Sequence, residues 1–163
     1  KEENFVFDLP ENIKNNSSSV QNLVENNLRK VIVEEKPTNP KYYERMSIIL
    51  DELIERKNKK KIEYEEYLRR IAQLTKQIKR EDDLHDYPIT INKPELRALY
   101  DNMDENEELA LNAYECIKEN LMPGYRGNII KERKLKNALR DIVGVDKVEE
   151  IFELIKNQDE FDQ

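Results

Sequence analysis

One basic stretch holds the side chains best suited to binding a charged partner. Residues 122–143 read MPGYRGNIIKERKLKNALRDIV. Between positions 126 and 140 there are six basic residues and one acid, a local charge of +5, whereas the whole chain carries −7 and the remainder therefore −12. Lysine and arginine bind phosphates and carboxylates through charge-assisted hydrogen bonds. The candidate contact residues for a partner protein or a nucleic acid are Tyr125, Arg126, Asn128, Lys131, Arg133, Lys134, Lys136 and Arg140.

A turn followed by a helix is predicted to present these side chains. Gly124 and Gly127 are two of only three glycines in the chain, which indicates a backbone that needs positive φ or a close approach. Asn128 is placed to cap the next helix, because its side-chain oxygen can accept a free N–H of the first turn. Gly144 is placed to end that helix. An apolar stripe of roughly helical period is predicted to face the core, and it comprises Ile130, Leu135, Ala138, Leu139 and Ile142.

Three interpretations of this basic helix remain open. A chain with a net charge of −7 is repelled by phosphates over most of its surface, which favours an acidic partner protein. The local charge of +5 and the abundance of Lys and Arg instead favour contact with DNA phosphates. The cations can also pair with acidic faces of the same bundle, such as residues 101–108.

The composition predicts a helical domain. A length of 163 residues fits one domain or one module of a larger chain, and the first residue, Lys1, leads us to expect a fragment. Few glycines and many Glu, Lys, Leu and Ile residues favour helices over strands. No apolar run approaches the roughly 18 residues of a membrane helix, so we expect no membrane contact. The only cysteine, Cys116, cannot form an intrachain disulfide and fits a reducing, cytoplasmic environment, where we expect it to be a packing residue.

The periodicity predicts an all-α fold, an irregular bundle of about six or seven helices. Residues 1–19 are weakly patterned and are interpreted as a loosely structured lead-in, followed by a helical module at 20–161. Within that module, amphipathic segments at 40–57 and 63–79 are joined by a short connector, so we expect them to form a central antiparallel pair. The other predicted helices are 20–35, a short one from Pro94, a longer one around 109–121, the basic helix at 129–143 and a last one around 148–155.

No motif in the chain predicts catalysis. There is neither a phosphate-binding loop nor a dinucleotide-binding glycine pattern. The single histidine, His85, lies in a predicted loop with Asp82, Asp83 and Asp86, and one histidine with loop carboxylates is a weak metal-site pattern that we interpret as a solvated connector. We therefore expect no catalytic residue, no cofactor and no metal ion in this chain.

Four stretches resemble the C-terminal region of the R subunit of type I restriction enzymes. They occur in the order found in that family and cover most of residues 20–161. The family usually has Trp where Tyr125 stands, after Asp-Gly rather than Pro-Gly. The stretches are ENNLRKVIVEEKPTNPKYYERMSIILDELIE at 25–55, IEYEEYLRRIAQL at 62–74, YPITINKPELRALYDN at 87–102, and GYRGNIIKERKLKNALRDIV at 124–143 followed by IFELIKNQDEF at 151–161.

This resemblance implies a function that composition and spacing do not show. The parent R subunit is an ATP-dependent motor and endonuclease that works with methyltransferase and specificity subunits on foreign DNA. Its nuclease and helicase-like domains, which use ATP and Mg²⁺, lie N-terminal to this region. The resemblance thus implies a non-catalytic assembly module that docks the motor on the methyltransferase core, with the rest of the R subunit and DNA as further partners. The alternative is a DNA-contacting module that uses the basic helix at 129–143.

Overall fold

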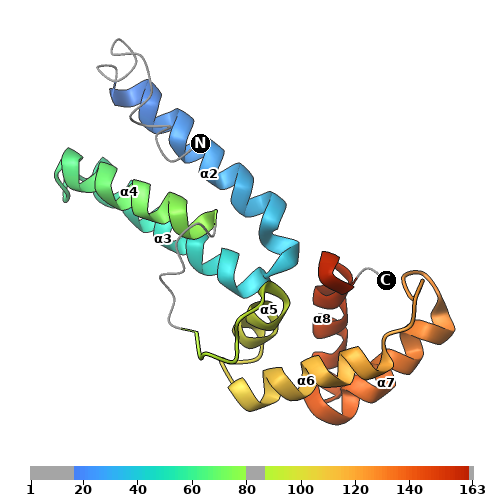
Figure 1. Cartoon of the computed structure of the whole chain (residues 1–163). Helices are drawn as coiled ribbons and strands as arrows, with labels where there is room; N and C mark the ends of the chain where they lie inside the picture. Colours follow the sequence, from blue (N-terminus) through green and yellow to red (C-terminus); the bar gives the residue numbers. More distant parts are fainter. Residues whose placement is uncertain (1–16, 80–86, 162–163) are drawn as a thin grey trace. The chain divides into compact units, whose positions relative to one another are not determined.

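The structure, a computed structural model, describes residues 17–79 and 87–161. These residues form seven α-helices and two short 3-10 helices, with no strand among them (Figure 1). The predicted all-α class and the predicted number of helices are therefore confirmed. The helices are α2 (Ser17–Glu35), η1 (Lys36–Thr38), α3 (Pro40–Asn58), α4 (Tyr64–Ile78), α5 (Pro94–Asn102), α6 (Glu107–Asn120), α7 (Ile129–Val143), α8 (Val145–Lys156) and η2 (Asp159–Phe161).

The first described helix begins earlier than predicted. Helix α2 starts at Ser17, so the last three residues of the predicted lead-in are helical. Serine is favoured at the start of a helix, because the N–H groups of the first turn have no intrahelical acceptor and a serine hydroxyl can accept a hydrogen bond from one of them. The rest of the predicted lead-in, residues 1–16, lies outside the described residues.

The described residues divide into two compact units, and the division falls within helix α3. The first unit holds α2, the greater part of α3, and α4, whereas the second holds residues 37–42 and everything from α5 onward. Side chains explain why residues 37–42 belong to the second unit. Asn39 donates to the Asp101 carboxylate at 2.8 Å, Asn102 donates to the Asn39 side-chain oxygen at 2.7 Å, and the backbone N–H of Lys41 donates to the Asn102 side-chain oxygen at 3.2 Å.

The first unit is a helical trio with a polar contact at its centre. The buried carboxylate of Glu25 on α2 accepts hydrogen bonds from the Tyr67 hydroxyl of α4, at 2.6 Å, and from Lys57 of α3. Burial and the adjacent Glu25 carboxylate raise the pKa of Tyr67, which therefore stays a neutral donor. Helices α3 and α4 run in opposite directions on either side of a short turn (Figure 1), so the predicted antiparallel pair is present.

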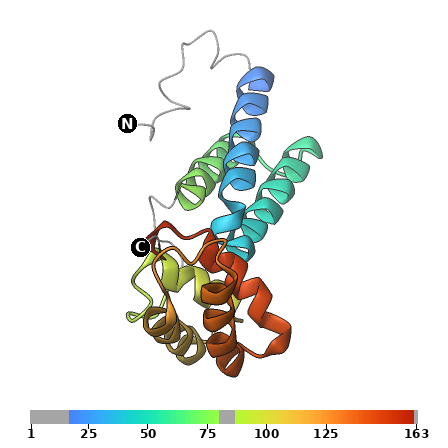
Figure 2. The ribbon, with the colours of Figure 1, turned by 90° about the vertical axis from the view of Figure 1, so that its right-hand side faces the viewer.

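In the second unit four helices surround one core. Helix α7 packs against α6 and α8, and α5 packs against the same two helices, which closes a ring of contacts (Figure 2). Cys116 of α6 lies in this core, and burial raises the pKa of its thiol. It is therefore a packing residue, as predicted. No helix among the described residues is long and apolar enough to cross a membrane.

We expect Leu50→Ala to destabilise the first unit by about 2–5 kcal/mol, because Leu50 is completely buried and its truncation leaves a cavity. Chemical denaturation monitored by circular dichroism measures the change. Ile48→Ala is the matched control, since Ile48 lies on the same helix with 53% of its surface exposed. Equal losses in the two variants would contradict this assignment of the core face.

Candidate functional site

Helix α7 has the boundaries that the sequence predicts. Its cap is Asn128, whose side-chain oxygen accepts a hydrogen bond from the backbone N–H of Lys131 at 3.2 Å. The Glu132 carboxylate accepts from the backbone N–H of Gly127 at 2.8 Å, which satisfies a further donor near the helix start. Gly127 and Gly144 have φ of 76° and 88°, values that favour glycine. Asn128, a candidate contact residue, thus serves as the cap of α7.

The buried face of α7 is narrower than the predicted stripe. Leu135 and Leu139 are completely buried, and Ala138 and Ile142 are partly buried against the same core. Ile130, which we expected in this stripe, is instead 82% exposed. Successive residues of an α-helix are rotated by about 100°, so nine residues separate Ile130 from Leu139 by about half a turn and place the two on opposite sides.

Tyr125 is a core residue, which corrects its prediction as a partner contact. Only 1% of its surface is exposed, and its ring packs edge-on against Phe152 of α8 with centroids 6.4 Å apart. Its hydroxyl is buried without a hydrogen-bond partner among the described residues, and burial raises its pKa. The turn before α7 folds this aromatic side chain inward, so a partner cannot reach it.

Arg126 is engaged by the end of helix α8 rather than left for a partner. Its Nε donates to the carbonyl of Lys156 at 3.0 Å, and its Nη2 donates to the carbonyl of Gln158 at 3.0 Å. The carbonyl of Lys156 belongs to the last turn of α8 and lacks an intrahelical donor, so this arginine satisfies an acceptor that would otherwise depend on water, whereas the carbonyl of Gln158 also accepts from the backbone N–H of Phe161. Its guanidinium also lies 4.9 Å from the centroid of the Tyr125 ring. Arg126 therefore fastens the turn before α7 to the C-terminus of α8.

Two of the five cations on α7 have partners within the second unit. The Lys131 ammonium donates to the carbonyl of Pro123. The Lys136 ammonium lies 3.0 Å from the Glu149 carboxylate and 4.6 Å from the centroid of the Phe152 ring. Both cations therefore help to hold α7 in place.

The acidic stretch 101–108 is not the partner of the basic helix. Among the described residues, no cation of α7 forms an ion pair with it, and Asp104 instead lies 3.8 Å from Lys147 of α8. Pairing of an α7 cation with an acidic face of the same bundle is seen instead between Lys136 and Glu149 of α8, an acid outside 101–108.

Three further cations of α7 point to solvent. The side chains of Arg133, Lys134 and Arg140 are exposed and make no hydrogen bond or ion pair within residues 17–79 and 87–161. Ile129 and Ile130, in the first turn, are 71% and 82% exposed. At about 100° per residue, these five side chains fall within roughly 140° of the helix circumference. We call this surface the α7 face, defined by Ile129, Ile130, Arg133, Lys134 and Arg140.

The α7 face has the composition of a binding surface without reactive groups. Large apolar side chains gain free energy when they leave water, at about 25 cal/mol per Å² of buried apolar area. Exposed cations beside them can bind carboxylates or phosphates. In the part of the chain that the structure describes, no group of three or more His, Cys, Asp or Glu residues could hold a metal ion. The weak pattern at Asp82, Asp83, His85 and Asp86 lies outside that part.

Comparisons of this chain with known proteins find no matching family model, no matching curated protein and no matching solved structure.

Arg126→Ala should lower the free energy of unfolding by about 1–2 kcal/mol, because it removes two charge-assisted hydrogen bonds at the end of α8. Arg133→Ala, which removes an equally charged but unpaired side chain, should change it by less than about 0.5 kcal/mol. Thermal and urea unfolding of both variants measure the difference. An unchanged free energy of unfolding in Arg126→Ala would show that water replaces the two hydrogen bonds of the arginine without a loss of stability.

Tyr125→Phe should leave stability unchanged or raise it slightly, because the hydroxyl that it removes is buried and unpaired. The matched variant, Tyr67→Phe, removes a hydroxyl that donates to Glu25 and should cost about 1–3 kcal/mol. Urea denaturation distinguishes the two. A large loss in Tyr125→Phe would reveal a partner for its hydroxyl, and this would overturn the assignment.

Proposed function

We propose that this chain is a helical assembly module from the C-terminal region of the R subunit of a type I restriction enzyme, and that it docks the motor subunit on the methyltransferase core through the α7 face. The supporting observation is the composition of that face, in which three unpaired cations lie beside two exposed isoleucines. The resemblance to the R subunit supplies the identity of the partner.

The exposed isoleucines favour a protein partner over a nucleic acid. Ile129 and Ile130 gain from burial only against apolar surface, which the phosphate backbone does not offer. Protein interfaces combine an apolar centre with a polar, charged rim. The matching surface on the methyltransferase core is therefore an apolar depression bordered by carboxylates, which would pair with Arg133 and Lys134.

DNA contact is the second candidate function, and the same unpaired cations favour it. Arg133, Lys134 and Arg140 can bind phosphates without reading sequence. The net charge of −7 opposes a broad approach of the chain to a duplex, so we rank this function second.

The proposed role requires no chemistry from this chain. ATP hydrolysis and Mg²⁺-dependent cleavage are assigned to the parent R subunit, and cofactors are therefore proposed only for that subunit. The proposed partners are the methyltransferase and specificity subunits, the rest of the R subunit and, in the complete complex, DNA. The proposed location is the cytoplasm, where foreign DNA would be cut.

Two sets of variants test the role of the α7 face. The charge-reversal triple Arg133→Glu, Lys134→Glu and Arg140→Glu should chiefly slow association with the purified methyltransferase complex, since exposed charges act on encounter. The double variant Ile129→Ser and Ile130→Ser should chiefly speed dissociation, because it removes buried apolar contacts. Surface plasmon resonance measures both rates. A charge-matched control in the first unit carries Lys30→Glu, Lys36→Glu and Lys61→Glu and should behave like the unmodified chain.

The DNA alternative predicts a different set of results. The unmodified chain would bind random duplex DNA, and the isoleucine variant would bind it normally. Each phosphate that the triple variant no longer binds would flatten the log–log salt slope by about 0.9. That outcome would replace the docking proposal. Unchanged association and dissociation rates in both α7 variants would also overturn it.

A further inference from the structure

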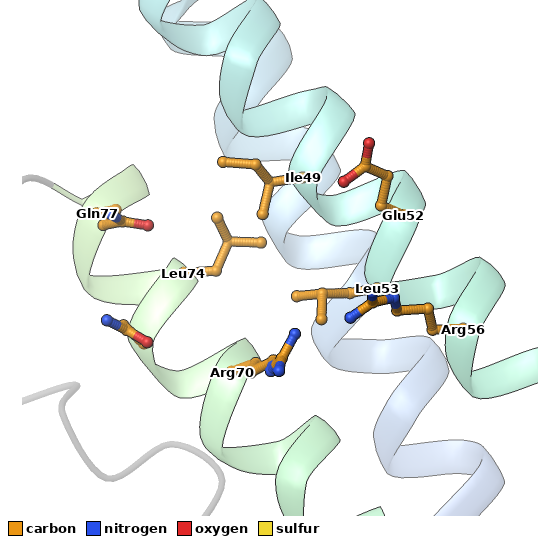
Figure 3. Close-up of a pocket in the computed structure, with 8 residues that line it drawn as sticks. Ile49, Glu52, Leu53, Arg56, Arg70, Leu74 and Gln77 are labelled. Atoms are coloured by element: carbon orange, nitrogen blue, oxygen red, sulfur yellow. The ribbon is translucent and has the colours of Figure 1, made fainter. Parts of the chain in front are cut away.

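The first unit contains a groove between α3 and α4 that the proposed docking through α7 does not use. Its volume is about 470 Å³, and helix α2 passes behind it (Figure 3). The residues that line it come equally from the two helices. They are Ile49, Glu52, Leu53 and Arg56 of α3, and Arg70, Gln73, Leu74 and Gln77 of α4.

The groove has an apolar floor and one positively charged end. Ile49, Leu53 and Leu74 supply the apolar lining; Leu53 and Leu74 are 5% and 2% exposed, so the partly buried Ile49 offers most of the accessible apolar surface. The side chains of Arg56 and Arg70 extend into the space between the helices from opposite sides (Figure 3).

One of the two arginines already forms an ion pair among the described residues, and the other does not. Arg70 donates through Nε to Glu66, one turn earlier on α4, at 2.8 Å. Arg56 forms no ion pair within the described residues. Glu52 is the only acid in the lining and Glu66 already pairs with Arg70, so Arg56 is the lining cation that remains available to a carboxylate of a partner.

The lining of the groove extends over two helical turns. The lining residues recur at 49, 52/53 and 56 on α3 and at 70, 73/74 and 77 on α4. Seven residues correspond to two helical turns, or about 10 Å. A bound helix with anchors three, four and seven residues apart can contact a lining of this length.

Apolar surface continues beyond the cavity, which favours a protein segment over a small molecule. Ile48 is 53% exposed and lies one turn before Glu52 and two turns before Arg56, so these three residues follow one stripe of α3. A ligand confined to the cavity would leave Ile48 exposed, whereas a helix lying along the stripe would cover it.

We propose that this groove binds an acidic amphipathic helix of a partner protein. Leucine-like side chains of that helix would rest on Ile49, Leu53 and Leu74. A carboxylate beside them would lie between Arg56 and Arg70, where guanidinium groups bind carboxylates through paired hydrogen bonds.

A pair of labelled peptides tests this site in the full 163-residue chain. The first is a fluorescein-labelled helical peptide with leucine at every third or fourth position and glutamate beside it, and the second carries lysine in place of each glutamate. Fluorescence anisotropy should show binding of the acidic peptide. The double variant Arg56→Glu and Arg70→Glu should weaken that binding by about tenfold or more and should bind the lysine peptide instead. The charge-matched control Lys30→Glu and Lys61→Glu should retain the original affinity.

A steric variant and a map of the contact surface complete the test. Gln73→Trp fills the groove without a change of charge and should weaken binding of the acidic peptide, while its melting temperature shows that it is folded. Methyl NMR should show shifts at Ile49, Leu53 and Leu74 on addition of peptide. Absence of binding, equal losses in the control variant, or shifts confined to Ile129 and Ile130 would each overturn the site. Because groove and α7 face belong to different units, failure of the α7 proposal leaves this test unaffected.

Discussion

The position of the α7 face depends on the hydrogen bonds that attach the turn before α7 to the C-terminal end of α8. Arg126 donates to the carbonyls of Lys156 and Gln158, and the adjacent Tyr125 is buried against Phe152. These contacts fix where the chain enters α7, and the cap at Asn128 fixes where the helix begins. From this starting point, the burial of Leu135 and Leu139 sets the rotation of α7 about its axis. Its leucines then face the core and its first-turn isoleucines face solvent.

The sequence was sufficient for the fold class and for local features, because both depend on short-range rules. The Asn128 cap, the bounds of α7 and the positive φ of Gly124 and Gly127 depend on interactions within a few residues, and these predictions were confirmed. The predicted apolar stripe is wrong at Ile130, because nine residues at about 100° each place Ile130 on the opposite side of the helix from the buried Leu139. The division within α3 depends on Asn39 reaching Asp101, 62 residues later, and no local pattern contains that information.

The basic stretch shows why local charge overstates the charge that a partner can use. Arg126 donates to a carbonyl at the end of α8, and Lys131 donates to the carbonyl of Pro123 in the turn before α7. Lys136 forms an ion pair with Glu149 of α8. Each bond requires a partner that folding supplies from another part of the chain. The number of cations is therefore evident from the sequence, but which of them form contacts within the folded chain is not. Within the described part of the chain, only Arg133, Lys134 and Arg140 remain available on α7.

The two proposed surfaces combine charge with apolar area in opposite ways. On the α7 face the isoleucines project outward and need a depression in the partner, whereas the groove between α3 and α4 receives a side chain from the partner. Each surface is small, and small contacts bind weakly because ordering costs offset much of the burial gain. Surfaces on two linked units avoid this limit, since the first contact raises the effective concentration of the second. If one partner protein engaged both proposed surfaces, it would be held more firmly than by either surface alone.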